Sequence, residues 1–196
     1  MKQIYSKRYG FTLLELMVTL AIGAVLMMIA VPSLISFQRN AELTSGANRL
    51  MASINAARGE AMKQGTNALV VPINNGADWN AGWIVFVYKF DAARTTPYVY
   101  DAAFGDKVIQ TQDALPSYIN VTDSIGGTAP YIMYDASGYS KTKANGFLAM
   151  TLNMTRTDLS GAELLTQTRR IKIASTGRVK VCKPASATDA NCLDTG

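Results

Sequence analysis

The apolar pattern begins with one long uncharged run. Residues 11–31 separate Gly10 from Pro32, and Glu15 is the only charged residue among them. A helix needs about 20 apolar residues to cross a bilayer core, so this run is long enough to span a membrane. It is too long for the apolar core of an ordinary secretory signal, which takes about 7–15 residues. The preceding residues 1–10 carry basic side chains and no acid, which predicts that they stay in the cytoplasm while the rest is exported.

Beyond Pro32 the pattern becomes amphipathic. Apolar residues recur at steps of three and four, which is the spacing of one buried helical stripe. The members of this stripe are Leu43, Ala47, Leu50, Ile54, Ala57 and Ala61. Because the apolar periodicity resumes directly after Pro32, the proline is expected to bend the helix without ending it. Gly65 favours a helix end, so we predict one helix over residues 11–64, with two helices broken at Pro32 as the alternative.

After Gly65 the period becomes that of β-strands. Strands are expected at residues 67–73, 82–88, 107–112, 118–122, 131–135, 147–155, 168–174 and 178–182. Pro72 places the first strand at a sheet edge or marks its end. The second strand is apolar on both faces, which predicts a central position.

The remaining segments are less regular. Residues 91–105 are expected to form a long surface loop, and residues 159–167 fit either a helical turn or a loop. The last two strands are expected to form a hairpin, because Ser175-Thr176-Gly177 separates two alternating segments.

Composition excludes several classes of site. The chain contains no histidine, which excludes His-based catalysis and His metal ligands. No nucleophile motif, metal cluster or phosphate loop occurs, so we predict no enzyme, no cofactor and no metal site. The two cysteines, Cys182 and Cys192, are too few for a zinc site on their own. An exported domain meets oxidising conditions, so we expect them to form a disulfide that closes a small loop.

Glu15 distinguishes the apolar run from an ordinary membrane anchor. A carboxylate among lipid tails is expensive and is usually paired, yet no basic residue lies within the run. Cleavage after Gly10 would give Phe11 a positive amine four residues from Glu15. The junction Gly10-Phe11-Thr12-Leu13-Leu14-Glu15 resembles the type III signal of type IV pilins and type II secretion pseudopilins. A generic signal anchor with one stray acid is the alternative.

The resemblance implies a processing and assembly pathway. Prepilin peptidase would cleave after Gly10, the Phe11 amine would be methylated, and Glu15 would set the filament register through an N-terminal amine. The subunit would span the inner membrane once with its head in the periplasm. It would then join other pilins in a pilus on the cell surface. Loss of the leader lowers the net charge from +5, because three of the 19 basic residues lie in it.

The resemblance also implies an α+β fold, the pilin lollipop, in which a long N-terminal helix packs on an antiparallel β-rich head. Residues 1–10 would be the leader and 11–37 the half-helix that lies in the membrane or filament core. Residues 38–196 would be the exported head, made of the amphipathic half-helix 38–64 and the β domain 65–196.

Two tryptophans narrow the resemblance to one branch. Trp79 and Trp83 flank Gly82 in a W-x-x-G-W motif, which resembles the FimT/FimU/GspH branch of the family. Without the resemblance, two tryptophans beside a strand are expected in the core. The branch implies a minor pilin that helps prime pilus assembly and sits at or near the tip. The alternatives are a DNA-binding minor pilin that serves natural transformation and a minor pseudopilin of a type II secretion system.

The predicted terminal hairpin is strongly basic. Its basic residues, with no acid among them, are Arg169, Arg170, Lys172, Arg178, Lys180 and Lys183. Strand alternation puts Arg170 and Lys172 on one face of their strand, and Arg178 and Lys180 on one face of theirs. Pairing of the strands would merge these faces into a basic stripe suited to DNA phosphates.

A short motif supports this interpretation. Gly177-Arg178-Val179-Lys180 resembles the Gly-Arg-x-Arg motif of DNA-binding FimT-type minor pilins, with Lys180 in place of the final arginine. Lysine still neutralises a phosphate but lacks the bidentate fork of arginine. A solvated face with ordinary surface charge is the alternative.

Overall fold

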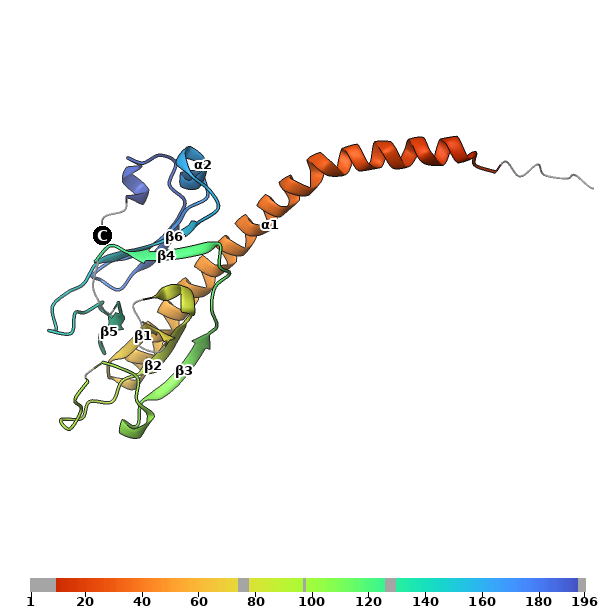
Figure 1. Cartoon of the computed structure of the whole chain (residues 1–196). Helices are drawn as coiled ribbons and strands as arrows, with labels where there is room; N and C mark the ends of the chain where they lie inside the picture. The colour runs from red at the N-terminus through yellow and green to blue at the C-terminus, as the bar shows by residue number, and fades with distance from the viewer. Residues whose placement is uncertain (1–9, 74–77, 97, 126–129, 194–196) are drawn as a thin grey trace, which may run out of the picture. The chain divides into compact units, whose positions relative to one another are not determined.

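A computed structural model describes residues 10–73, 78–96, 98–125 and 130–193 (Figure 1). The chain divides into two compact units, residues 1–41 and 42–196, and the long helix α1 (Leu13–Gln64) contributes to both. The strands are β1 (Ala68–Pro72), β2 (Trp83–Val87), β3 (Lys107–Gln112), β4 (Ile119–Asp123), β5 (Ile132–Tyr134), β6 (Met150–Arg156), β7 (Arg169–Ile173) and β8 (Val179–Cys182). The short helices are η2 (Trp79–Ala81), η3 (Ala102–Phe104), α2 (Gly161–Thr166) and η4 (Ala190–Cys192).

In the first unit, α1 continues through Pro32 without interruption. The alternative of two helices broken at Pro32 is therefore wrong, because proline removes only its own N–H donor and the flanking apolar residues maintain the helix. Large apolar side chains from Phe11 to Phe37 are exposed on this segment. By length and composition, α1 can cross a membrane here. The leader residues 1–9 lie outside the described part of the chain.

In the second unit, the other half of α1 packs against both sheets. All six members of the predicted apolar stripe are fully buried. They share one core with side chains from each sheet, including Val85 of β2 and Leu152 of β6. The stripe therefore faces the sheets. Its burial in their shared core explains the amphipathic pattern of the sequence.

The first sheet has the order β3-β2-β1-β5, and all neighbouring strands are antiparallel. The central position predicted for residues 82–88 is confirmed for β2. β1 also lies inside the sheet, so the edge position that Pro72 suggested is wrong. Pro72 instead is the last residue of β1, opposite Trp83. Its missing N–H donor therefore interrupts no hydrogen bonds further along the strand.

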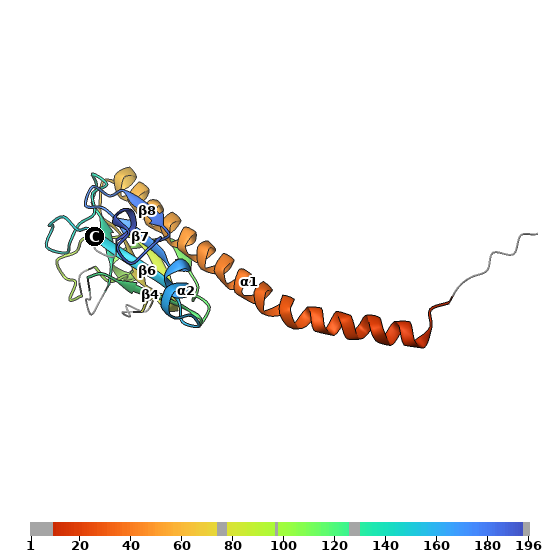
Figure 2. The same ribbon diagram turned by 90° about the horizontal axis from the view of Figure 1, so that it is seen from above.

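The second sheet has the order β4-β6-β7-β8 and is also antiparallel (Figure 2). β6 begins at Met150, later than predicted, because Phe147 forms an isolated bridge with Lys141 in a separate turn. The ambiguous residues 159–167 contain the helical turn α2. The predicted hairpin is confirmed as β7 and β8.

The tryptophan motif belongs to the core, as predicted. Trp79 and Trp83 are buried, and the indole N–H of Trp83 donates to Ser53 Oγ on α1 at 2.9 Å. Gly82 has φ +97°, and a Cβ there would lie 2.2 Å from the carbonyl oxygen of Gln112. The glycine of W-x-x-G-W is therefore required by backbone conformation and by close approach of the 112–113 backbone.

Candidate functional site

The N-terminal motif starts the helix. Glu15 donates its backbone N–H to Thr12 Oγ1 at 3.2 Å, and Leu16 donates its N–H to the carbonyl oxygen of Thr12 at 3.2 Å. Thr12 thus acts as an N-cap, and the carboxylate of Glu15 lies in the first turn, where the helix dipole favours an acid. Gly10 and Phe11 precede the helix and are exposed. The predicted cleavage bond therefore lies in accessible, non-helical chain.

The β7–β8 register places the predicted cations on one face. Lys172 lies directly opposite Lys180, and Arg170 lies opposite Cys182. Arg178 precedes β8, and its carbonyl oxygen accepts the N–H of Ala174 at 2.9 Å. The two faces therefore merge, and the facing lysines concentrate positive charge at the centre of the hairpin.

Two arginines of the hairpin are buried, and the burial of Arg170 removes it from the predicted stripe. Arg169 points toward α1 and donates to Thr44 Oγ1 at 3.1 Å, and burial lowers its pKa. Arg170 lies on the predicted face but is only 8% exposed. Its Nε donates to Asn153 Oδ1 at 3.1 Å, and its Nη1 donates to the carbonyl oxygen of Cys192. Arg170 therefore holds the C-terminal loop and is not presented to a ligand.

Three of the four remaining cations line a cleft of about 380 Å³. Lys172, Arg178 and Lys180 contribute the charge, and Asn191 contributes an amide from the C-terminal loop. Ala149, Ile173, Ala174 and Ser175 complete the described lining, which contains no acidic residue. We call these eight residues the cationic cleft. Its charge suits phosphate or carboxylate groups.

The turn that carries Arg178 is fixed from α1. Gly177 has φ +83°, and a Cβ there would lie 1.9 Å from the carbonyl oxygen of Gly138. Arg58 Nε donates to that same carbonyl at 2.9 Å, and Arg58 Nη2 donates to the carbonyl oxygen of Thr176 at 3.3 Å. The glycine before Arg178 is therefore required by packing, and Arg58 positions the turn that bears the cation.

The C-terminal loop closes beside the cationic cleft. Cys182 and Cys192 form the predicted disulfide, with their Cα atoms 5.9 Å apart. Within the loop, Asp189 accepts the backbone N–H groups of Ala185 and Asn191, each at 3.0 Å. These two hydrogen bonds lower the pKa of Asp189, and nearby cations lower it further.

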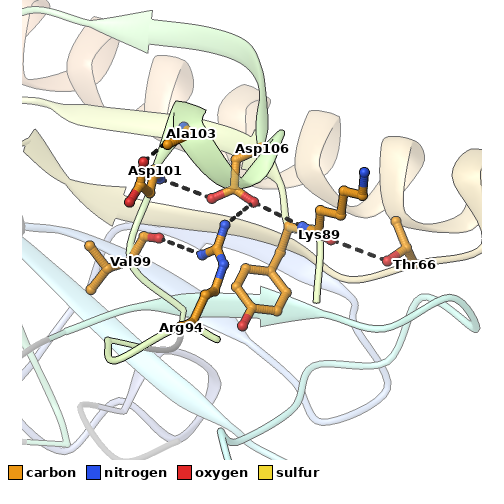
Figure 3. Close-up of polar contacts among 8 residues, drawn as sticks. Thr66, Lys89, Arg94, Val99, Asp101, Ala103 and Asp106 are labelled. Carbon is orange, nitrogen blue, oxygen red and sulfur yellow. Dashed lines mark hydrogen bonds and ion pairs between the residues drawn. The ribbon is translucent and has the colours of Figure 1, made fainter. Parts of the chain in front are cut away.

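A buried ion pair joins Arg94, in the segment expected to be a surface loop, to Asp106, the residue that follows this segment (Figure 3). Arg94 and Asp106 approach to 2.7 Å, and their side chains are 2% and 0% exposed. Burial disfavours the charge of Arg94, but the hydrogen bond and charge of Asp106 outweigh it and raise the pKa of Arg94. Nothing in the local sequence marked this pair, because its members are twelve residues apart in irregular chain.

Further contacts tie this ion pair to the sheet. The carboxylate of Asp106 accepts the backbone N–H groups of Lys89 at 2.9 Å and Asp101 at 3.0 Å. The Arg94 guanidinium lies 4.5 Å from the ring centre of Tyr88 and 4.8 Å from that of Phe104. The carboxylate of Asp106 thus joins Arg94 to the backbone of two neighbouring segments, so this cluster anchors the loop.

Comparisons with known proteins identify the family. The family model described as "Type II transport protein GspH" matches residues 46–177, which is more than half of the chain. The chain belongs to the GspH family. A second model, the "Prokaryotic N-terminal methylation motif", matches residues 5–31. A search of curated protein sequences finds no significant match.

One solved structure shows the same fold. The type IV minor pilin FimU of Pseudomonas aeruginosa is 18% identical, with a TM-score of 0.52 over 76% of this chain and 98% of that chain. The minor pseudopilin EpsH of the type 2 secretion system of Vibrio cholerae is 16% identical, with a TM-score of 0.49 over 74% of this chain and 99% of that chain.

Membership of the GspH family decides the general class. The protein is a minor pilin or pseudopilin of the type IV pilin class, which implies assembly with other pilins. The predicted recognition and the predicted fold, a long N-terminal helix followed by antiparallel sheets, are confirmed. The apolar helix and the methylation motif suit membrane anchoring of a pilin. The family and its fold are those of structural subunits and not of known enzymes.

Proposed function

We propose that this GspH-family protein is a minor type IV pilin that helps prime pilus assembly and sits at or near the pilus tip. The supporting observation is the position of Glu15. It lies in the capped first turn of α1, in the part of the helix whose large apolar side chains are exposed. Apolar helices of several subunits would pack together in the filament core. A carboxylate in that environment needs a partner. The amine of Phe11, freed by prepilin peptidase and methylated, supplies one.

The proposed pathway follows from the same segment. The subunit spans the inner membrane once, with its head in the periplasm, and then joins major and minor pilins in a pilus on the cell surface. Glu15 sets the register between subunits and plays no part in folding of the head. Substitution of Glu15 should therefore change filament assembly without changing the folding of the head.

The test replaces the native subunit by Glu15→Ala in cells that make pili. We expect the variant to be exported, to form the Cys182–Cys192 disulfide, and to be absent from sheared filaments. Glu60→Ala is the matched control, because Glu60 is an acid on α1 outside the apolar segment. That control should enter filaments normally. Normal incorporation of Glu15→Ala would overturn the proposal.

A pseudopilin of a type II secretion system is the second candidate for the same assembly chemistry. Membership of a family described as a type II transport protein supports this candidate. Deletion of the gene distinguishes the two. Loss of surface pili with normal protein secretion supports the pilus role. Loss of secretion with normal pili assigns the chain to a secretion pseudopilus.

The cationic cleft favours one further candidate function, DNA capture during natural transformation. Lys172, Arg178 and Lys180 converge on one concave surface, and the latter two are exposed. DNA binding by such cations weakens as the salt concentration rises. The logarithm of the binding constant falls with the logarithm of the salt concentration, with a slope of about 0.9 per contacted phosphate of duplex DNA. Arg170 does not contribute, because it is buried under the C-terminal loop.

The test is binding of labelled DNA by the purified chain across a salt series. We expect Arg178→Ala/Lys180→Ala to weaken binding and to reduce the salt slope. Lys63→Ala/Lys107→Ala removes the same charge from another part of the head and should leave both unchanged. Equal affinity and equal slope for the first variant and the native chain would exclude the cleft as a DNA site.

A further inference from the structure

Two aromatic rings are exposed on the turn between β5 and β6. The side chain of Phe147 is 64% exposed and that of Tyr139 is 42% exposed. Their ring centres lie 5.6 Å apart at an interplanar angle of 70°, which is an edge-to-face pair. We call these two residues the aromatic pair. Two exposed rings in contact form a small apolar patch that a partner could cover.

The protein holds these rings in place. Lys141 Nζ lies 3.9 Å from the ring centre of Phe147, and the same ammonium lies 3.6 Å from Asp135 Oδ2. The isolated bridge between Lys141 and Phe147 fixes the backbone beneath them. Since the ring is already ordered, a partner that stacks on it loses little additional side-chain freedom.

The aromatic pair adjoins the cationic cleft. Ala149, two residues after Phe147, lines the cleft, so the two Cα atoms are at most about 7 Å apart along the chain. On the other strand of the turn, Ser140 next to Tyr139 donates its N–H to the carbonyl oxygen of Ser175 at 3.1 Å. Ser175 also lines the cleft. The backbone that carries the aromatic pair therefore borders the cationic cleft, and the two features make up one candidate surface.

We propose that this surface binds single-stranded DNA, with the sugar–phosphate backbone along Lys172, Arg178 and Lys180 and unpaired bases stacked on Phe147 and Tyr139. Proteins that bind single strands combine a positively charged groove with aromatic rings on which bases stack. A duplex keeps its bases inside the helix, so only a single strand gains from the rings. The inference rests on the proposed DNA contact and names the form of DNA that the site prefers.

The test uses the full chain in non-ionic detergent micelles and two labelled probes, an oligothymidylate and a duplex of equal length. Stacking of one base contributes about 1–3 kcal/mol, so we expect Phe147→Ala to weaken single-strand binding by about 5- to 150-fold. The same variant should leave duplex binding and the salt slope unchanged, because it removes no charge. Phe147→Tyr should restore binding, since it retains a ring.

Phe90→Ala is the matched control, because Phe90 is an exposed phenylalanine that does not line the cationic cleft. It should bind both probes as the native chain does. If Phe147→Ala has no effect while Arg178→Ala/Lys180→Ala abolishes binding, the aromatic inference fails and the DNA function stands. If the native chain binds neither probe at low salt, both fail. An equal loss for single strand and duplex would also overturn the stacking role.

Discussion

At the scale of single residues, Gly177 leaves the least room for a Cβ among the glycines that the structure describes. Its φ of +83° disfavours any other residue, and a Cβ would lie 1.9 Å from the carbonyl oxygen of Gly138. Gly177→Ala must therefore adopt a strained conformation and displace the Arg58 contact as well. We expect the free energy of unfolding to fall by about 2–3 kcal/mol, measured by chemical denaturation of the chain in detergent.

Two other glycines make this a graded test. Gly59 lies within α1 with no atom within 4 Å of a built Cβ, so Gly59→Ala should stabilise the chain by about 0.5–1 kcal/mol. Gly161 has φ +58° but open space, so Gly161→Ala should fall between the two. A Gly177→Ala variant as stable as Gly161→Ala would show that the turn moves away from Gly138 without penalty.

Arg170 shows where prediction from single residues ends. Alternation along a strand correctly gave its face, because the side-chain period of two is a local property of the backbone. Its burial depends on the C-terminal loop, which returns over β7 from residues far along the chain. No local pattern encodes such a return. The N-terminal motif could be recognised because it is contiguous, and the methylation-motif match confirms it. The roles of Gly10 and Glu15 stay predictions, and the capping role of Thr12 emerged only from the structure.

At the scale of elements, the C-terminal loop depends on one ionised carboxylate. Hydrogen bonds from the backbone of Ala185 and Asn191 lower the pKa of Asp189 below its ordinary value of 3.8. The support that Asp189 gives the loop is therefore fully present above that value and is lost as the pH falls through the lower, folded pKa. We expect the amide NMR signals of Ala185 and Asn191 to shift toward unstructured positions only below about pH 4. Asp189→Asn should abolish this transition, and a transition persisting in that variant would assign it to another group.

The loop over residues 91–105 depends on the buried ion pair. Asp106→Asn would leave Arg94 charged and enclosed, and removal of one partner of a buried pair typically costs about 3–5 kcal/mol. We expect a loss of that order in unfolding free energy, together with faster proteolysis within the loop. Lys63→Ala breaks an exposed pair with Glu60 and should cost less than about 0.5 kcal/mol. Equal losses of unfolding free energy in the two variants would show that the Arg94 guanidinium becomes hydrated when Asp106 is replaced.

Strands and helices were predictable to the extent that their periodicity is local. The stripe on α1 and the alternation in β7 and β8 both arise from one buried face, and both were predicted close to their observed bounds. The start of β6 was misplaced because Phe147 continues the apolar pattern but serves a different turn. The order of the strands in the two sheets depends on long-range pairing, which no periodicity specifies.

At the scale of the whole molecule, the proposed assembly requires removal of the leader before α1 enters a filament. The uncleaved chain keeps three basic residues ahead of the apolar run and has no free amine at Phe11 to pair with Glu15. We therefore expect Gly10→Val to block processing. By intact mass the chain should remain at 21.1 kDa, and it should be retained in the membrane and absent from sheared filaments. Gly23→Val, a matched change inside the apolar run with no atom within 4 Å of a built Cβ, should be processed normally. Entry of the uncleaved Gly10→Val chain into filaments would show that assembly needs the apolar helix but not the amine at Phe11, and it would remove the role proposed for Glu15.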